Sequence, residues 1–110
     1  MMRVLSLGAM LAGTVLYTGN AWAADKAGDA AKGKELFEQC SVCHNVDTDE
    51  KKMGPSLKGL YKRDKLKSGK KVNDENVRAQ INAGGNGMPA YEDMLSDKDR
   101  ADIIAYLKTL

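Results

Sequence analysis

The sequence is poor in the residues that several common protein chemistries require. Its 110 residues include one histidine, two cysteines, one phenylalanine and one tryptophan. A structural zinc site needs about four cysteine or histidine ligands, so this chain could complete one only with carboxylates. No segment shows sustained alternation of apolar and polar residues, and there is no internal repeat or low-complexity tract. The sequence therefore predicts an all-α domain.

Long apolar runs are also absent, since none reaches the roughly 20 residues that a membrane span needs. Residues 4–16 are mostly apolar but short, and they follow a basic start at Arg3. Ala21-Trp22-Ala23 then places small residues at the two positions that a signal peptidase reads. We predict a secretory signal peptide over residues 1–23 and one domain over residues 24–110, located in the periplasm without a membrane span. An uncleaved N-terminal anchor is the alternative.

Residues 24–110 offer little material for a self-sufficient core. They contain one phenylalanine, three tyrosines and no tryptophan, and a domain this small often needs a cofactor, metal or disulfide for stability. A large flat cofactor would supply the missing apolar volume. The formal net charge of +2 and the low aromatic content argue against nucleic-acid binding.

Three helical patterns are separated by long loops. The first covers Asp29–Gln39 with Asp29 as N-cap, and the second covers roughly Asp74–Ala83 after the capping residue Asn73. Ser96 and Asp99 form a capping box before the last helix. Residues 47–71 are loop-like, rich in charge and interrupted by glycine. Because long loops in a compact domain often cover a functional group, we expect three or four short helices around a cofactor.

The strongest motif is Cys40-Ser41-Val42-Cys43-His44. A C-x-x-C-H run is the attachment pattern of c-type haem. Two thiols three residues apart on a helical turn can each add to one haem vinyl group, and the histidine that follows then lies under the iron. A thioredoxin-like motif would need a βαβ setting. A Cys40–Cys43 disulfide remains possible in a secreted protein. We therefore predict one covalently bound haem c, with His44 as an iron ligand.

Four blocks in this order resemble the class I cytochromes c over nearly all of residues 24–110. The resemblance implies the cytochrome c fold, in which three to four short helices and long loops wrap around one haem. A short loop after Arg63 and the lack of tryptophan in residues 24–110 point to the short bacterial members of that family. The blocks are Gly33-x-x-x-Phe37 before C-x-x-C-H, GPSLKGLYKR at residues 54–63, GMPAY at residues 87–91 and DIIAYLK at residues 102–108.

The resemblance implies that Met88 is the second axial iron ligand. Glycines at positions 84, 85 and 87 let the backbone pass close to a flat group. Met53 lies nine residues after His44, before a Gly-Pro turn, and Met94 is interpreted as a core residue. His/Met ligation is one of the ligand sets of c-type haem. Methionine is also a common gap-filling core residue, and this alternative stays open for Met88.

The resemblance also implies supporting roles around the haem. The carbonyl of Pro55 would accept a hydrogen bond from His44 and fix its orientation. Arg63 would lie near a haem propionate, where a planar guanidinium suits a carboxylate. A plain turn proline and one more charge on a basic loop are the alternatives. The first and last helices would cross through Gly33, Phe37, Ile103 and Tyr106.

Filling both axial positions leaves no site for a substrate. We therefore expect a monomeric single-electron carrier between donor and acceptor proteins, not an enzyme. One alternative is a haem-based gas sensor or small peroxidase with a displaceable distal ligand. Another is a dedicated haem subunit of a periplasmic oxidoreductase.

Charge is distributed unevenly despite the small net value. A basic loop, with Asp64 as its one acid, suggests docking to an acidic partner surface with salt-sensitive rates. A solvated loop with no partner is the equal alternative. The basic residues of this loop are Lys58, Lys62, Arg63, Lys65, Lys67, Lys70 and Lys71.

Overall fold

The computed structural model describes residues 28–110. These residues form three α-helices: α2 (Ala30–Leu36), α3 (Asp74–Ala83) and α4 (Asp97–Leu107). Two single 3₁₀ turns, η1 (Phe37–Gln39) and η2 (Leu60–Lys62), complete the regular structure. Within residues 28–110 the only β-structure is two isolated bridges, and no helix there is long and apolar enough to cross a membrane. The predicted signal peptide at residues 1–23 lies outside the described residues.

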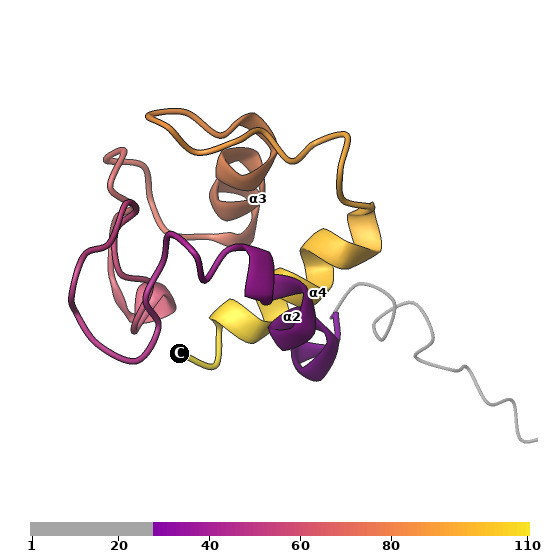
Figure 1. Cartoon of the computed structure of the whole chain (residues 1–110), viewed down its shortest axis with the longest axis horizontal. Coiled ribbons are helices and arrows are strands. Elements are labelled where there is room, and N and C mark those ends of the chain that lie inside the picture. The colour runs from indigo at the N-terminus through magenta and orange to yellow at the C-terminus, as the bar shows by residue number, and fades with distance from the viewer. Residues whose placement is uncertain (1–27) are drawn as a thin grey trace, which may run out of the picture.

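The helices cross rather than run side by side (Figure 1). α2 lies across α4, and α3 lies above this crossing in the view. The magenta and pink loops between α2 and α3 fill one end of the molecule, and the orange segment after α3 passes over that helix before it descends to α4. The all-α prediction is confirmed for the described residues.

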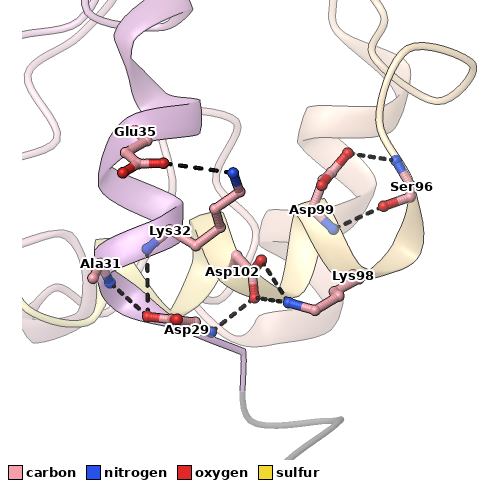
Figure 2. Close-up of polar contacts among 8 residues, drawn as sticks. All are labelled: Asp29, Ala31, Lys32, Glu35, Ser96, Lys98, Asp99 and Asp102. Carbon is pink, nitrogen blue, oxygen red and sulfur yellow. Dashed lines mark hydrogen bonds and ion pairs between the residues drawn. The ribbon is translucent and has the colours of Figure 1, made fainter.

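Side-chain caps begin each helix where the sequence predicts. Asp29 accepts hydrogen bonds from the backbone N–H groups of Ala31 and Lys32, and Asn73 accepts one from Asn76. The predicted capping box is present, since Ser96 and Asp99 each accept from the other's backbone N–H (Figure 2). The structure differs from the sequence-based prediction at two places. The first helix ends in a 3₁₀ turn, and an unpredicted 3₁₀ turn, η2, lies inside the long loop. Short 3₁₀ turns are common at helix ends and in connections.

The crossing of α2 and α4 has the packing expected from the sequence. Gly33 is buried, and a Cβ there would lie 1.9 Å from the carbonyl oxygen of Asp102. The Phe37 and Tyr106 ring centroids are 5.4 Å apart at an interplanar angle of 59°, a tilted arrangement typical of favourable aromatic pairs. Ile103 is part of the same buried core. Glycine at position 33 therefore permits a close helix approach that any side chain would block.

A buried carboxylate fastens the start of α2 to α4 (Figure 2). Asp102 is 1% exposed and accepts hydrogen bonds from the Asp29 backbone N–H at 2.8 Å and from the Lys98 ammonium at 3.0 Å. Burial by itself would raise the pKa of Asp102, but these two donors outweigh it and hold the pKa below its usual value. Sequence reasoning did not assign this role to Asp102, because its partner Asp29 is 73 residues away.

Candidate functional site

The C-x-x-C-H motif forms one compact turn at the end of η1. The backbone N–H groups of Cys43 and His44 both donate to the Cys40 carbonyl, at 3.1 and 3.0 Å. Cys40 and Cys43 are half-buried free thiols, so the alternative disulfide is not formed. Burial and then the neighbouring Cys43 raise the pKa of the Cys40 thiol. Both sulfur atoms therefore remain available on one turn of chain.

The side chain of His44 is held in one orientation. Its Nδ1 lies 2.7 Å from the carbonyl oxygen of Pro55. A carbonyl can only accept, so this contact requires the proton on Nδ1 and leaves the lone pair on Nε2. Gly54 lies against the ring, since a Cβ there would be 2.5 Å from His44 Cε1. The expected Pro55 hydrogen bond is thus present, and Nε2 is available as a metal ligand.

The loop behind Pro55 is tied down by its own polar groups. Arg63 donates from its two terminal nitrogens to the carbonyls of Ser56 and Lys58, at 3.2 and 2.6 Å. Ser56 is buried, and its hydroxyl donates to the Thr48 carbonyl at 2.5 Å. Arg63 therefore braces the segment that positions the His44 acceptor. Its expected contact with a propionate stays a prediction.

Met88 ends a tight backbone hairpin that follows α3. Gly85 and Met88 exchange two backbone hydrogen bonds, at 2.9 and 3.0 Å. The two residues between them, Asn86 and Gly87, have φ of 52° and 91°. Two positive φ angles are the requirement of a type I′ turn, for which Asn-Gly is the favoured sequence. The Asn-Gly pair was therefore a readable signal for this hairpin, although sequence reasoning used only the glycines.

Gln80 of α3 is a neighbour of Met88 that sequence reasoning missed. Its Nε2 donates to the Gly84 carbonyl at 2.9 Å and lies 4.0 Å from the Met88 sulfur. It also lines a pocket of about 270 Å³ between α3 and the loop at Leu66. The i+8 separation from Met88 gives no periodic signal, because the chain leaves the helix between the two residues.

The other two methionines of the domain are on the surface. Met53 is 81% exposed and Met94 is 60% exposed, whereas Met88 is half-buried. The interpretation of Met94 as a core residue is wrong. The turn in which the N–H groups of Met94 and Leu95 both donate to the Tyr91 carbonyl sends Leu95 into the core and leaves Met94 outside.

Tyr91, three residues after Met88, is partly buried against the same hydrophobic core as Cys40. Burial raises the pKa of Tyr91, and Cys40 and Cys43 raise it further. No hydrogen bond described for residues 28–110 joins Met88 directly to Cys40, Cys43 or His44. The loop after Met88 and the cysteine turn therefore each contribute a side chain to one apolar core.

The apolar surroundings fit a flat hydrophobic group. Within residues 28–110 the core has seven buried hydrophobic side chains, and eleven more are only partly buried against it. A cofactor bound over these half-buried groups would complete their burial. By contrast, no three histidine, cysteine, aspartate or glutamate side chains in this part of the chain come together as a metal site, so the zinc alternative has no ligand set. The partly buried groups outside the helix crossing include Cys40, Val46, Leu57, Leu66, Val72, Ile81 and Tyr91.

Comparisons with known proteins agree with this geometry. Residues 30–110 match the family model for cytochrome c. Cytochrome c of Tetrahymena pyriformis is 31% identical over 99 residues, covering 76% of this chain and 90% of that protein. Cytochrome c6 of a Picosynechococcus species is 34% identical over 85 residues, covering 74% and 73%.

Solved structures show the same fold. Cytochrome c6 of the diatom Phaeodactylum tricornutum superposes with a TM-score of 0.60 at 27% identity, covering 74% of this chain and 93% of that one. Cytochrome cH of Methylobacterium extorquens superposes with a TM-score of 0.54 at 30% identity, covering 76% and 100%. The all-α architecture and the C-x-x-C-H turn thus occur in a chain that matches the family over almost all of its described length. The chain belongs to the cytochrome c family of small electron carriers, which bind one haem c covalently.

Proposed function

We propose that this chain is a periplasmic single-electron carrier, with haem c attached through Cys40 and Cys43 and its iron ligated by His44 and Met88. The observation that carries the proposal is the 2.7 Å contact between His44 Nδ1 and the Pro55 carbonyl. It leaves Nε2 as the one free nitrogen of the ring and fixes the direction of its lone pair. The two free thiols on the preceding turn support covalent attachment at the same place.

The haem, when bound, supplies a reversible one-electron couple at its iron. The protein supplies orientation and surroundings. His44 presents Nε2 from a ring held by Pro55 and Gly54, and the Gly85–Met88 hairpin presents a thioether from a fixed backbone. A thioether ligand favours the ferrous state and raises the reduction potential. Because His44 and Met88 would both ligate the iron, no coordination site would be left for a substrate, and we therefore propose a carrier that is not an enzyme.

The test is an absorption spectrum of the protein expressed with a haem-attachment system, in both redox states and with carbon monoxide. His/Met ligation gives the weak long-wavelength sulfur-to-iron band in the ferric form, a low-spin ferrous form and no response to carbon monoxide. Met88→Ala should abolish the band. Met53→Ala and Met94→Ala are matched controls, because both side chains are exposed, and they should retain it.

Two results would reject the carrier proposal. A high-spin wild type, or one that binds carbon monoxide readily, would indicate an open or displaceable distal site and therefore a gas sensor or small peroxidase. A band lost in Met53→Ala or Met94→Ala but retained in Met88→Ala would reject the ligand assignment. Co-purification in fixed stoichiometry with an oxidoreductase would instead favour a dedicated haem subunit over a free carrier.

The proposal includes a cleaved signal peptide and a monomeric domain. The Ala21-Trp22-Ala23 pattern supports cleavage after Ala23, leaving residues 24–110 in the periplasm. Intact-mass measurement of protein from the periplasmic fraction tests this, because it should give the mass of residues 24–110 plus one haem. A full-length mass in the membrane fraction would indicate a retained anchor. Light scattering of the purified domain tests the monomer.

The partners are donor and acceptor proteins, and we place their docking site on the basic loop. None of its lysine ammonium groups lies within 4.0 Å of a carboxylate in residues 28–110, so their charge is not neutralised locally. Uncompensated positive charge steers association with an acidic surface. Lys65→Glu with Lys67→Glu should slow electron transfer at low salt and flatten its salt dependence. Lys34→Glu, exposed on α2, is the control, and equal effects of both changes would remove the docking role.

A further inference from the structure

The segment that follows Met88 is held at Glu92 by both neighbouring helices. On the α3 side, the backbone N–H groups of Tyr91 and Glu92 donate to the carbonyls of Ile81 and Asn82, at 3.0 and 3.3 Å. On the α4 side, Arg100 donates through one terminal nitrogen to the Glu92 carbonyl at 3.2 Å. The two polar groups of the Glu92 backbone are therefore bound by different helices, and the chain from Met88 to α4 cannot move without breaking one of these contacts.

Arg100 has the features of a clamp. It is 7% exposed, and the same terminal nitrogen that contacts Glu92 also donates to the buried Leu95 carbonyl at 2.7 Å. Its other terminal nitrogen is paired with Asp97 one turn earlier on α4, which orients the guanidinium. Hydrogen bonds from a charged donor are stronger than neutral ones, and burial strengthens them further.

The cost of burying Arg100 argues that these bonds matter. Its Nε is buried and has no hydrogen-bond partner in the described residues. An unpaired buried donor is destabilising, and an apolar side chain could fill this place without that penalty. What an apolar side chain could not do is donate hydrogen bonds to two loop carbonyls, those of Glu92 and Leu95. The guanidinium therefore serves the backbone of the loop rather than the packing of α4.

At its other end, the same segment is fixed by the Gly85–Met88 hairpin. The backbone at Gly84 packs closely against that of Met88, because a Cβ at position 84 would lie 2.3 Å from the Met88 carbonyl oxygen. The hairpin holds the segment before Met88 and Arg100 holds it after. Loss of either anchor should let Met88 swing away without unfolding the helix crossing, since local opening can occur at a lower free energy than global unfolding.

We propose that Arg100 is a positioning residue for the distal ligand: by clamping the Glu92 and Leu95 carbonyls, it keeps the Met88 segment closed and so protects the sixth iron position from external ligands. The inference rests on the proposed ligation by Met88. It adds a determinant on α4 that touches neither the ligand nor the cofactor and controls how readily the ligand is displaced.

The test is imidazole binding to the ferric protein, followed by loss of the sulfur-to-iron band, together with denaturant unfolding of the same samples. Arg100→Gln loses charged hydrogen bonds to two carbonyls, so imidazole should bind about tenfold or more tightly. Arg100→Lys, which keeps the charge but not the two-nitrogen geometry, should give a smaller gain. If Arg100→Gln fails to fold, the imidazole affinity of Arg100→Lys still tests the positioning role.

Two controls separate positioning from general damage. Asp102→Asn weakens the α2–α4 crossing without touching the Met88 segment, so it should lower global stability while leaving imidazole affinity within about twofold of wild type. Arg78→Gln removes one exposed charge from α3 and should change neither the imidazole affinity nor the global stability. Unchanged imidazole affinity in both Arg100 variants would overturn the inference, as would an equal gain in Asp102→Asn. A wild type without the sulfur-to-iron band overturns the Met88 ligation and the inference together.

Discussion

The crossing of α2 and α4 and the segments that carry His44 and Met88 are built in different ways. The crossing is held by side chains in contact, with a glycine under a carbonyl, two tilted rings and a buried carboxylate. The segments are held by backbone hydrogen bonds and by turns with positive φ, four of them in succession at residues 84–87. Their apolar side chains are only partly buried by the protein itself.

This difference separates what the chain stabilises alone from what the haem must complete. The side chains at the crossing are buried by the protein itself, so substitutions there should lower the free energy of unfolding directly. The segments around the haem expose apolar surface that a cofactor would cover, so substitutions there should first alter how the iron ligands are held. The following predictions test that division, from the largest expected effect to the smallest.

Gly33→Ala should give the largest loss of stability. Its Cβ would fall 1.9 Å from the Asp102 carbonyl oxygen, and backbone at a helix crossing cannot yield easily. We expect the free energy of unfolding to fall by about 3 kcal/mol, measured by denaturant titration of the haem-loaded protein. An alanine variant as stable as the wild type would show that α2 and α4 do not approach each other so closely at Gly33.

Asp102→Asn should cost about 2 kcal/mol at neutral pH, because it removes a charged acceptor from the Asp29 N–H and the Lys98 ammonium. In the wild type the pKa of Asp102 is below its ordinary value of 3.8 in the folded state. Its contribution is therefore complete above that ordinary pKa and is lost as pH falls toward the lower folded-state pKa.

The variant should consequently lose less stability on acidification than the wild type does between about pH 5 and pH 2. Unfolding curves at a series of pH values provide the measurement. Parallel pH profiles for the two proteins would show that Asp102 is not the group being titrated.

Gly87→Ala and Gly69→Ala form a matched pair that contrasts the Met88 hairpin with an ordinary loop. Their φ angles are 91° and 89°, and neither Cβ would meet another atom within 4 Å. Each should cost about 1 kcal/mol for the left-handed conformation. Only Gly87→Ala should also weaken the sulfur-to-iron band and make Met88 easier for imidazole to displace. Equal behaviour of the two variants would mean that the hairpin does not position Met88.

Asp74→Asn should have the smallest effect, about 0.5 kcal/mol. Asp74 accepts from Lys108 at 2.8 Å and from the Tyr61 hydroxyl at 2.9 Å, but its side chain and that of Lys108 are roughly half exposed. The Lys108 hydrogen bond is the main cause that lowers the pKa of Asp74, against a smaller opposing contribution from burial. In high salt the stability lost by Asp74→Asn should become smaller, because salt screens exposed charges. The stability lost by Asp102→Asn should not change, because that carboxylate is buried.

Features that depend on neighbours in sequence were predictable. The caps at Asp29, Asn73 and Ser96, the bounds of α3 and the C-x-x-C-H turn all rest on contacts within a few residues. The family resemblance added the crossing of Gly33 with Tyr106, which spacing alone would not have shown. The ligand roles of His44 and Met88 stay predictions until the spectra are measured.

Features that depend on distant partners were not predictable. Nothing in the sequence distinguishes Asp102 from Asp97 and Asp99 on the same helix, and its buried role follows only from the approach of Asp29. The sequence gives no signal for the role of Arg100, because its carbonyl partners lie on a loop without regular structure. Met94 was misplaced because an apolar residue next to Leu95 can face either way until the turn at Tyr91 is known.

The exposure of Met53 and Met94 has a consequence for chemical damage. Thioethers open to solvent are the ones that peroxide converts first to sulfoxides, and this conversion makes a flexible apolar side chain polar. On Met53 and Met94, which are already in contact with water, a sulfoxide would disturb little packing. Oxidants that reach the protein surface would thus be consumed at two expendable sulfur atoms before they reach the half-buried one proposed to bind iron.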